Sequence, residues 1–209
     1  MMGRGWRPIL DAGLGDGRTR ILGVFLILVA ILGTYLMRAY ANIETVFVAS
    51  LLAGSLLGRW WTVLVPLTAL AVLQPLEWSA PYRGYALNSM IGLTFFIVSG
   101  YVFVALLGRR IRPRILFRVK SVALLTTISV PLTTAYDLWT ASGEWYFITR
   151  PFGVSLATVL EGQVVFTLYH LLSSMIFVPL FGSAFLFLKE LGWPAKSPEM
   201  VSSKPLEHE

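Results

Sequence analysis

Long stretches of apolar residues, broken by short segments that carry most of the charge, organise this chain. A helix that crosses the hydrocarbon core of a bilayer needs about 17–25 mostly apolar residues. The second and third of the stretches that approach this length are short, and only Arg59 separates them, which favours a tight helical hairpin. Six stretches are predicted to be membrane-spanning helices: Ile21–Met37, Ile43–Gly58, Trp60–Leu76, Tyr85–Gly108, Val119–Trp139 and Leu156–Val178.

A further apolar run, Ser183–Leu188, follows the sixth stretch after Pro179 and Gly182. It is too short to cross a bilayer by itself. We interpret it as a continuation of the sixth helix, or as an interfacial helix that ends at Lys189. A seventh crossing is the less favoured alternative, because it would place the lysines that follow on the outside.

The composition supports this interpretation. Of the 209 residues, 56% are hydrophobic and only 13% are charged, whereas a soluble domain carries about 25% charged residues. The chain has no cysteine, and its two histidines are His170 and His208, so thiolate metal sites, disulfides and histidine-rich metal cages are excluded. We therefore predict an all-α integral membrane protein in contact with membrane lipid, with no metal and no cofactor. No basic patch is interleaved with aromatic residues, so nucleic acid is not predicted as a partner.

The distribution of basic residues predicts how the chain is oriented. With the N-terminus inside, 14 of the 17 lysines and arginines fall in inner segments, and only Arg38, Arg83 and Arg150 fall in outer ones. Cytoplasmic loops carry such an excess, so we predict a multi-pass protein of the plasma membrane with both termini in the cytoplasm. The domain organisation follows: a cytoplasmic segment over residues 1–20, a six-helix transmembrane domain over 21–191 and a disordered cytoplasmic tail over 192–209.

One alternative concerns the first helix. Arg18 and Arg20, the apolar run after them and the small residues around Tyr40 resemble the parts of a signal peptide. The apolar run of 17 residues is longer than the usual core of 7–15 residues. We therefore favour a retained first helix.

Polar residues inside the predicted spans are concentrated toward the outer side, which suggests that this half is the functional one. The sixth span carries a stripe of polar residues at helical spacing: Gln163, Thr167, His170 and Ser174. The fifth carries another: Thr126, Ser129, Thr133, Tyr136, Asp137 and Thr140. Because neither stripe is suited to hydrocarbon, we expect them to face each other or a shared cavity. Serines and threonines in such helices also often bond only to their own backbone or to a neighbouring helix.

Asp137 and His170 are the most informative of these residues. A salt bridge to Arg83 or Arg150 would explain Asp137 alone. His170 lies 14 residues into its helix, about 20 Å deep at 1.5 Å per residue. It is expected either to form the floor of a cavity or to bond a buried serine or tyrosine. No nucleophile elbow, metal-binding motif, phosphate-binding glycine loop or Walker sequence is present, so catalysis is not predicted.

Three segments carry a resemblance to a known family: the run from Glu44 to Gly58, the block Thr134–Thr140, and the stretch from Phe166 to Pro179. Each is similar to a segment at the matching place in the membrane-embedded S-components of energy-coupling factor (ECF) vitamin transporters. The similarity covers residues 21–188. It implies a six-helix bundle that binds a small molecule near the outer face and associates with a transmembrane coupling subunit and two ATPase subunits.

The resemblance also implies a motif of two small residues on the first helix that packs against the coupling subunit. The family's pair of alanines is replaced here by Ala30 and Thr34, with Gly33 beside them. This departure leaves open a relative of the family that binds alone or that works in another membrane complex.

The leading hypothesis is thus a substrate-binding subunit of an ECF-type uptake transporter. In it Trp139 and Trp145 stack on a small ligand, and an acidic, aromatic site favours a cationic or donor-rich heterocycle. The complete set of predicted binding residues is Asn88, Tyr136, Asp137, Trp139, Trp145, Gln163 and His170. The alternative is a non-transporting structural subunit with the same fold and a cavity filled by its own side chains. A third and least favoured hypothesis is an intramembrane enzyme, which would need Asp137 and His170 within hydrogen-bond reach beside an open cleft.

Overall fold

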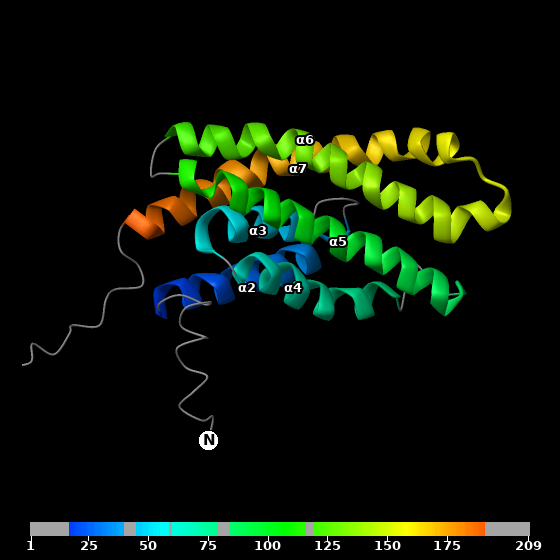
Figure 1. Cartoon of the computed structure of the whole chain (residues 1–209), viewed down its shortest axis with the longest axis horizontal. Helices are drawn as coiled ribbons and strands as arrows, with labels where there is room; N and C mark the ends of the chain where they lie inside the picture. Colours follow the sequence, from blue (N-terminus) through cyan, green and yellow to red (C-terminus); the bar gives the residue numbers. More distant parts are fainter. Residues whose placement is uncertain (1–16, 40–44, 59, 79–83, 116–118, 191–209) are drawn as a thin grey trace, which may run out of the picture.

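The computed structural model describes residues 17–39, 45–58, 60–78, 84–115 and 119–190. Within these ranges every regular element is helical, as Figure 1 shows. Each of the six predicted stretches contains a helix, and Ile43 and Glu44 at the start of the second lie outside the described residues. The elements are α2 (Gly17–Met37), α3 (Thr45–Leu52) with the π-helical turn η1 (Ala53–Leu57), α4 (Trp61–Trp78), α5 (Leu87–Ile111) with the 3₁₀ turn η2 (Arg112–Arg114), α6 (Val119–Glu144) with the turns η3 (Trp145–Thr149) and η4 (Arg150–Phe152), and α7 (Leu156–Glu190).

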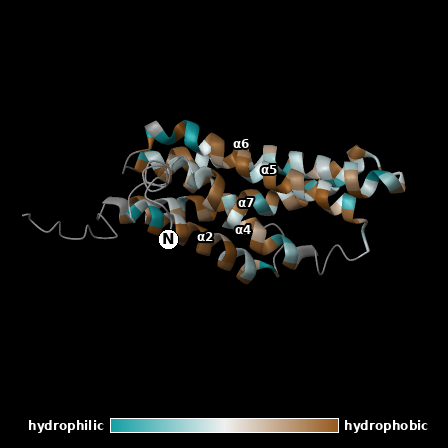
Figure 2. Cartoon of the chain, turned by 60° about the horizontal axis from the view of Figure 1, so that its bottom comes forward, coloured by the Kyte–Doolittle hydropathy of each residue, from teal (hydrophilic) through white to brown (hydrophobic). Residues whose placement is uncertain are grey.

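Three of these helices, α2, α5 and α7, are long and apolar enough to cross a membrane. The helix over Thr45–Leu57 and the one over Trp61–Leu76 are apolar but shorter. The polar stripe of α6 lowers its hydropathy, and α6 is not among the three despite its 26 residues. Figure 2 shows hydrophobic residues along most of the length of the bundle, with hydrophilic ones mostly toward its two ends. These features indicate a membrane protein.

The short helix α3 forms the centre of the bundle. Every residue from Thr45 to Gly58 is buried, and α3 contacts α2, α4, α5 and α7. A helix that is apolar on all sides is suited to this position. Its contact with α5 is tight, since a Cβ atom on Gly54 would overlap the backbone carbonyl of Ala105 and one on Gly108 would crowd the carbonyl of Leu51.

The longest elements, α6 and α7, lie side by side as an antiparallel hairpin (Figure 1). The expected end of the fifth helix at Trp139 is wrong, because α6 continues to Glu144 and its helical path runs on through η3 and η4. The hydroxyl groups of Thr140 and Ser142 bond the carbonyls of Tyr136 and Leu138 on the preceding turn. These polar residues therefore belong to a helix and not to a loop.

The sixth helix is also longer than its apolar stretch. It runs unbroken through Pro179 to Glu190, which confirms that the last apolar run continues this helix. The hairpin turns at Gly153, whose backbone is left-handed with φ of 78°. Glycine adopts this conformation without steric cost, and so it fits the reversal between the two helices.

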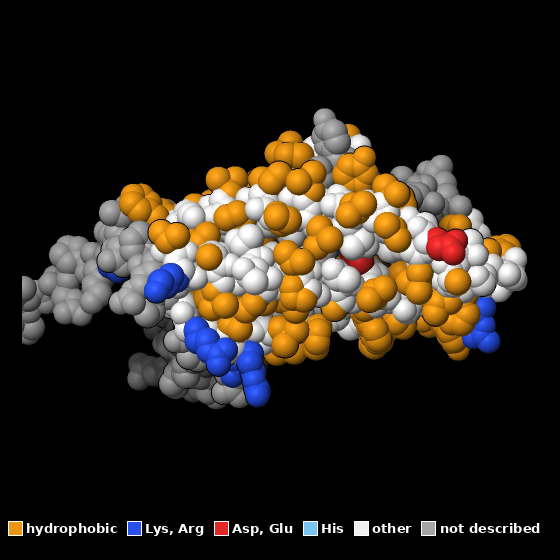
Figure 3. Space-filling view, turned by 90° about the horizontal axis from the view of Figure 1, so that it is seen from above, with side chains coloured by type: hydrophobic (Ala, Val, Ile, Leu, Met, Phe, Trp, Pro, Cys, Tyr) orange, Lys and Arg blue, Asp and Glu red, His pale blue; other side chains and the backbone are white. Residues whose placement is uncertain are grey.

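Most of the described basic residues lie at one end of the bundle, which we call the basic end (Figure 3). It is formed by the start of α2, the end of α5 with η2, and the start of α6. The hairpin turn between α6 and α7 lies at the opposite end (Figure 1). The basic end comprises Arg18, Arg20, Arg109, Arg110, Arg112, Arg114 and Lys120.

Candidate functional site

A buried hydrogen bond joins the middle of α6 to the middle of α7. Asp137 Oδ1 and His170 Nδ1 are 2.8 Å apart, and the two residues are only 2% and 1% exposed. Asp137 lies 13 residues before Arg150 and His170 lies 14 residues after Leu156, so each is about 20 Å from the hairpin turn at 1.5 Å per residue. The antiparallel hairpin thus brings together Asp137 and His170, the two ionisable residues that the sequence places within or close to the apolar part of the spans.

A salt bridge to Arg83 or Arg150 was the alternative explanation for Asp137. Arg83 lies outside the described residues. The guanidinium of Arg150 instead lies over the rings of Trp145 and Tyr146, 5.5 and 5.1 Å from their centroids. The described partner of Asp137 is therefore His170 and not Arg150.

Aromatic rings from three helices enclose the pair. Phe47 of α3 and Tyr136 of α6 meet the imidazole of His170 edge to face, with ring centroids 5.1 and 5.6 Å away. Tyr101 of α5 packs against Tyr136 at 4.5 Å. A buried ion or dipole in such surroundings is poorly screened, because little water reaches it.

The pair leaves hydrogen-bonding capacity unused. Asp137 Oδ2 and His170 Nε2 find no partner among the described residues, and neither do three nearby hydroxyl groups. Those hydroxyls belong to Thr133, one helical turn from Asp137, to Ser173, one turn from His170, and to Ser50, one turn from Phe47. A buried polar group without a partner costs about 1–3 kcal/mol. Five such atoms are distributed over the helices α3, α6 and α7.

Most of the other hydroxyls in the polar stripe of α6 are used locally. Thr126 donates to the carbonyl of Val122, and Ser129 donates to that of Thr126. In this part of the stripe the hydroxyl groups therefore bond only the backbone of their own helix, as serines and threonines in membrane helices often do. It does not hold for Thr133, which is fully buried and bonds nothing among the described residues.

The predicted binding residues divide into two groups. Tyr136, Asp137 and His170 come together in the buried cluster, whereas the two tryptophans lie elsewhere. Trp139 is 43% exposed, stacks on Phe96 at 4.4 Å and donates its indole N–H to Ser99. Trp145 donates to the carbonyl of Val154 near the hairpin turn.

The remaining two predicted residues are also apart from the pair. Asn88 is exposed on the first turn of α5. Gln163 is half-buried, and it precedes His170 by seven residues, about 10 Å along α7. Glu144, beyond the predicted end of the fifth span, is also near the hairpin turn, and partial burial raises the pKa of its carboxyl. The seven residues therefore do not line one open cavity.

The residues that sequence reasoning missed come mainly from α3. Phe47 covers His170, and Ser50 is a polar residue within a helix that is otherwise mostly apolar. The spacing of three residues between them was an available signal, because it puts both on one helical face. Ser173 was overlooked beside Ser174, which bonds the carbonyl of Leu171.

The small-residue face of the first helix packs inside the chain. Ala30 is fully buried, and its carbonyl accepts a hydrogen bond from the Thr45 hydroxyl at 3.0 Å. Thr34 meets the same hydroxyl at 3.3 Å, and a Cβ atom on Gly33 would overlap the Thr45 side chain. Of the residues expected to bind a coupling subunit, Ala30 is thus buried against α3, whereas Gly33 and Thr34 contact Thr45 and stay half-buried.

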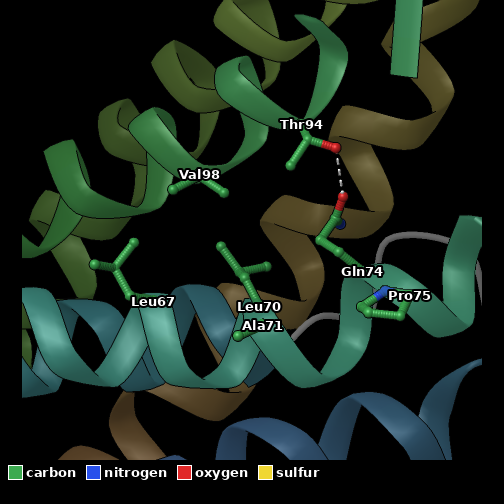
Figure 4. Close-up of a pocket in the computed structure, with 7 residues that line it drawn as sticks. All are labelled: Leu67, Leu70, Ala71, Gln74, Pro75, Thr94 and Val98. Atoms are coloured by element: carbon green, nitrogen blue, oxygen red, sulfur yellow. Dashed lines mark hydrogen bonds between the residues drawn. The ribbon is translucent and has the colours of Figure 1, made fainter. Parts of the chain in front are cut away.

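A separate cavity of about 330 Å³ lies between α4 and α5 (Figure 4). Thr94 donates a hydrogen bond to the Gln74 side chain at one end of it, and the rest of the wall is apolar. None of the seven predicted binding residues contributes to it. Its lining consists of Leu67, Leu70, Ala71, Gln74, Pro75, Thr94 and Val98.

The described residues contain no group of three or more His, Asp or Glu side chains that could hold a metal ion. No protein-family model matches the chain, and neither a curated protein nor a solved structure is significantly similar to it. The fold and the site together define an all-helical protein with membrane-type helices and a polar, incompletely bonded Asp–His pair at its centre.

Proposed function

We propose that this chain is a membrane-embedded small-molecule-binding subunit of an ECF-type uptake transporter, with its binding centre at Asp137 and His170. The observation that carries the proposal is the buried pair itself, whose Asp137 Oδ2 and His170 Nε2 have no partner among the residues that the structure describes. Ionisable residues inside membrane helices are costly and usually serve a function. A ligand that satisfied these atoms would repay part of that cost.

The proposed topology has six crossings. The basic end lies in the cytoplasm, because cytoplasmic segments are enriched in lysine and arginine. The hairpin turn between α6 and α7 then faces outward, and a substrate reaches the pair from that side of the plasma membrane. The short helix α3 is shielded from lipid by its neighbours, so its length does not have to match the bilayer core.

Uptake requires partners that supply energy, and we propose a transmembrane coupling subunit with ATPase subunits in this role. The small-residue face of α2 is occupied by α3, so the coupling subunit would bind the opposite, exposed face. That face carries Val24, Phe25, Leu28 and Leu32 among its exposed apolar side chains. Membrane lipid covers it when the subunit is alone.

Native mass spectrometry of the gently purified protein tests this function. A co-purifying molecule of small mass is expected, and Asp137→Asn should reduce its occupancy without unfolding the chain. Asn keeps an oxygen that accepts from His170, so the substitution changes charge while preserving shape. Glu161→Gln is the matched control, because it also removes one negative charge, from an exposed position on α7. Equal occupancy in wild type and Asp137→Asn would contradict the assigned site.

A structural subunit of a larger membrane complex is the second candidate. The near-complete burial of Asp137 and His170 beneath Phe47 and Tyr136 favours it. In that case the pair serves only to link α6 to α7. Purification with a stoichiometric protein partner, with neither ligand nor ATPase subunits, would favour this candidate over the first.

A further inference from the structure

We propose that the basic end binds an anionic phospholipid, with the headgroup phosphate held by the arginines that follow α5 and the acyl chains lying against apolar side chains next to them. This interaction goes beyond the proposed function, because it would serve a transporter subunit and a structural subunit alike. It follows from the unbalanced charge of this end, from the way in which η2 is anchored, and from the apolar residues beside the arginines.

Five basic residues of this end have no acidic partner among the described residues. All five are exposed, and none forms an ion pair within the described part of the chain. The acidic residues whose side chains the structure describes are Asp137, Glu144 and Glu161. Even Asp137 lies 18 residues after Val119, about 27 Å along α6, and on the face shown in Figure 3 the acidic side chains lie away from the basic end. Such a surface attracts anions. The five residues are Arg109, Arg110, Arg112, Arg114 and Lys120.

The turn η2, which carries two of these arginines, is anchored in the core. Ile111 and Ile115, on either side of it, are only 8% and 7% exposed, whereas Arg112 and Arg114 are exposed. The guanidinium of Arg112 lies over Gly58, where its Nη1 atom would be 2.8 Å from an added Cβ atom. The buried isoleucines thus hold the arginines at the surface, and less conformational freedom is lost when they bind a headgroup.

The type of basic residue is suited to phosphate. Four of the five are arginine, whose planar guanidinium donates two parallel N–H bonds to a phosphate, whereas a lysine offers a compact point charge. A carboxylate accepts the same pair of bonds. The arginines therefore specify an anion of this geometry, and their surroundings select between a phospholipid and an acidic peptide.

Apolar side chains beside the arginines favour the phospholipid. On α5, Phe103 and Leu106 are 53% and 46% exposed. They precede Arg110 by seven and four residues, which places all three on one face of the helix. On α6, Val119 is 86% exposed directly before Lys120. A phospholipid presents apolar chains and then a charged phosphate in this order, whereas an acidic peptide would leave the apolar side chains uncovered.

Two phospholipids with the same acyl chains test the proposal, one with the anionic phosphatidylglycerol headgroup and one with the zwitterionic phosphatidylcholine headgroup. Each is titrated into the purified full-length protein in a neutral detergent, and the shift of the thermal unfolding midpoint reports binding. Phosphatidylglycerol should bind at least about tenfold more tightly at low salt. Because the basic side chains are exposed, about 0.5 M salt should remove most of this preference.

Paired substitutions locate the lipid. Arg110→Gln with Arg114→Gln should reduce the preference for phosphatidylglycerol at least about fivefold, since each basic residue adds to the attraction. Arg38→Gln with Arg150→Gln is the matched control. It removes two positive charges from the opposite end, where both guanidinium groups lie over aromatic rings, and it should leave the preference unchanged. Arg110→Lys with Arg114→Lys keeps the charge and should keep most of the preference, which separates a loss of charge from a loss of folding.

Three results would overturn the proposal: equal binding of the two lipids, an unchanged preference in the glutamine pair at the basic end, or the same thermal shift from inorganic phosphate alone. A salt-sensitive complex with an acidic protein, together with no preference between the lipids, would assign the basic end to a protein partner instead. Failure here is distinguishable from failure of the proposed function, because the lipid preference does not involve Asp137 and should be the same in Asp137→Asn.

Discussion

The contact between α3 and α5 and the contact between α6 and α7 are packed in opposite ways. Between α3 and α5, glycines bring backbones into direct contact, and the interface is dry and apolar. Between α6 and α7, a carboxylate and an imidazole meet, and four buried polar atoms of these two helices find no partner within the described part of the chain. The first contact is optimised for stability. The second contact forgoes stability, which is expected where a protein binds something.

The largest expected effect tests the dry contact. A Cβ atom on Gly54 would overlap the carbonyl of Ala105, and backbone cannot move aside as a flexible side chain can. Gly54→Ala should therefore lower the free energy of unfolding by about 3 kcal/mol or more. Thermal unfolding in detergent measures this. Gly162→Ala is the matched control, since nothing lies within 4 Å of its added atom, and it should change little or stabilise.

The next effect tests the polar contact. His170→Leu leaves the Asp137 carboxylate buried without a partner and should lower the free energy of unfolding by about 3 kcal/mol, the lower end for a broken buried pair. Adding Asp137→Leu removes that charge, so the double variant should recover much of the lost stability. Ligand binding should be absent from the double variant even though it folds. A double variant as unstable as His170→Leu would show that the pair is needed for packing alone.

The smallest effect compares two threonines of the polar stripe on α6. The Thr133 hydroxyl is buried and unpaired, whereas that of Thr126 bonds the Val122 carbonyl. Thr133→Val should raise the free energy of unfolding of the ligand-free protein by about 1 kcal/mol, and Thr126→Val should lower it by a similar amount or less. Chemical denaturation of both variants measures the difference. A loss of stability in Thr133→Val would contradict the unpaired state of its hydroxyl.

The helices could be predicted from the sequence because their apolar stretches are long. Their ends could not always be predicted, as α6 shows. Ser142, Gly143 and Glu144 are typical of a loop, yet Gly143 packs directly on the Phe96 ring, where a Cβ atom would overlap it. A contact with another helix thus extends α6 beyond the point where its own residues favour stopping.

The site was predicted only in part for a related reason. Helical spacing placed Asp137 and His170 on polar faces of neighbouring helices, and the hairpin register brought them together. Spacing within one helix carries no information on which third helix covers the pair, so Phe47 and Ser50 of α3 were missed. Trp139 was grouped with the pair, but its ring packs on Phe96 and is partly exposed, as is common for aromatic side chains that anchor helix ends at interfaces.

The length of α7 has a consequence for where the pair lies relative to water. Its 35 residues measure about 52 Å along the axis, against a hydrocarbon core of about 30 Å. Even at a tilt of about 40°, the upper end of the usual range, such a helix rises about 40 Å through the bilayer. At least about 10 Å of it must then project into the headgroup layer or beyond. At the same tilt, the roughly 20 Å along the helix from the hairpin turn to Asp137 and His170 correspond to about 15 Å of depth. If the projecting part is at the hairpin turn, the pair lies about 5 Å below the edge of the hydrocarbon core, where local thinning of the bilayer would suffice to hydrate it.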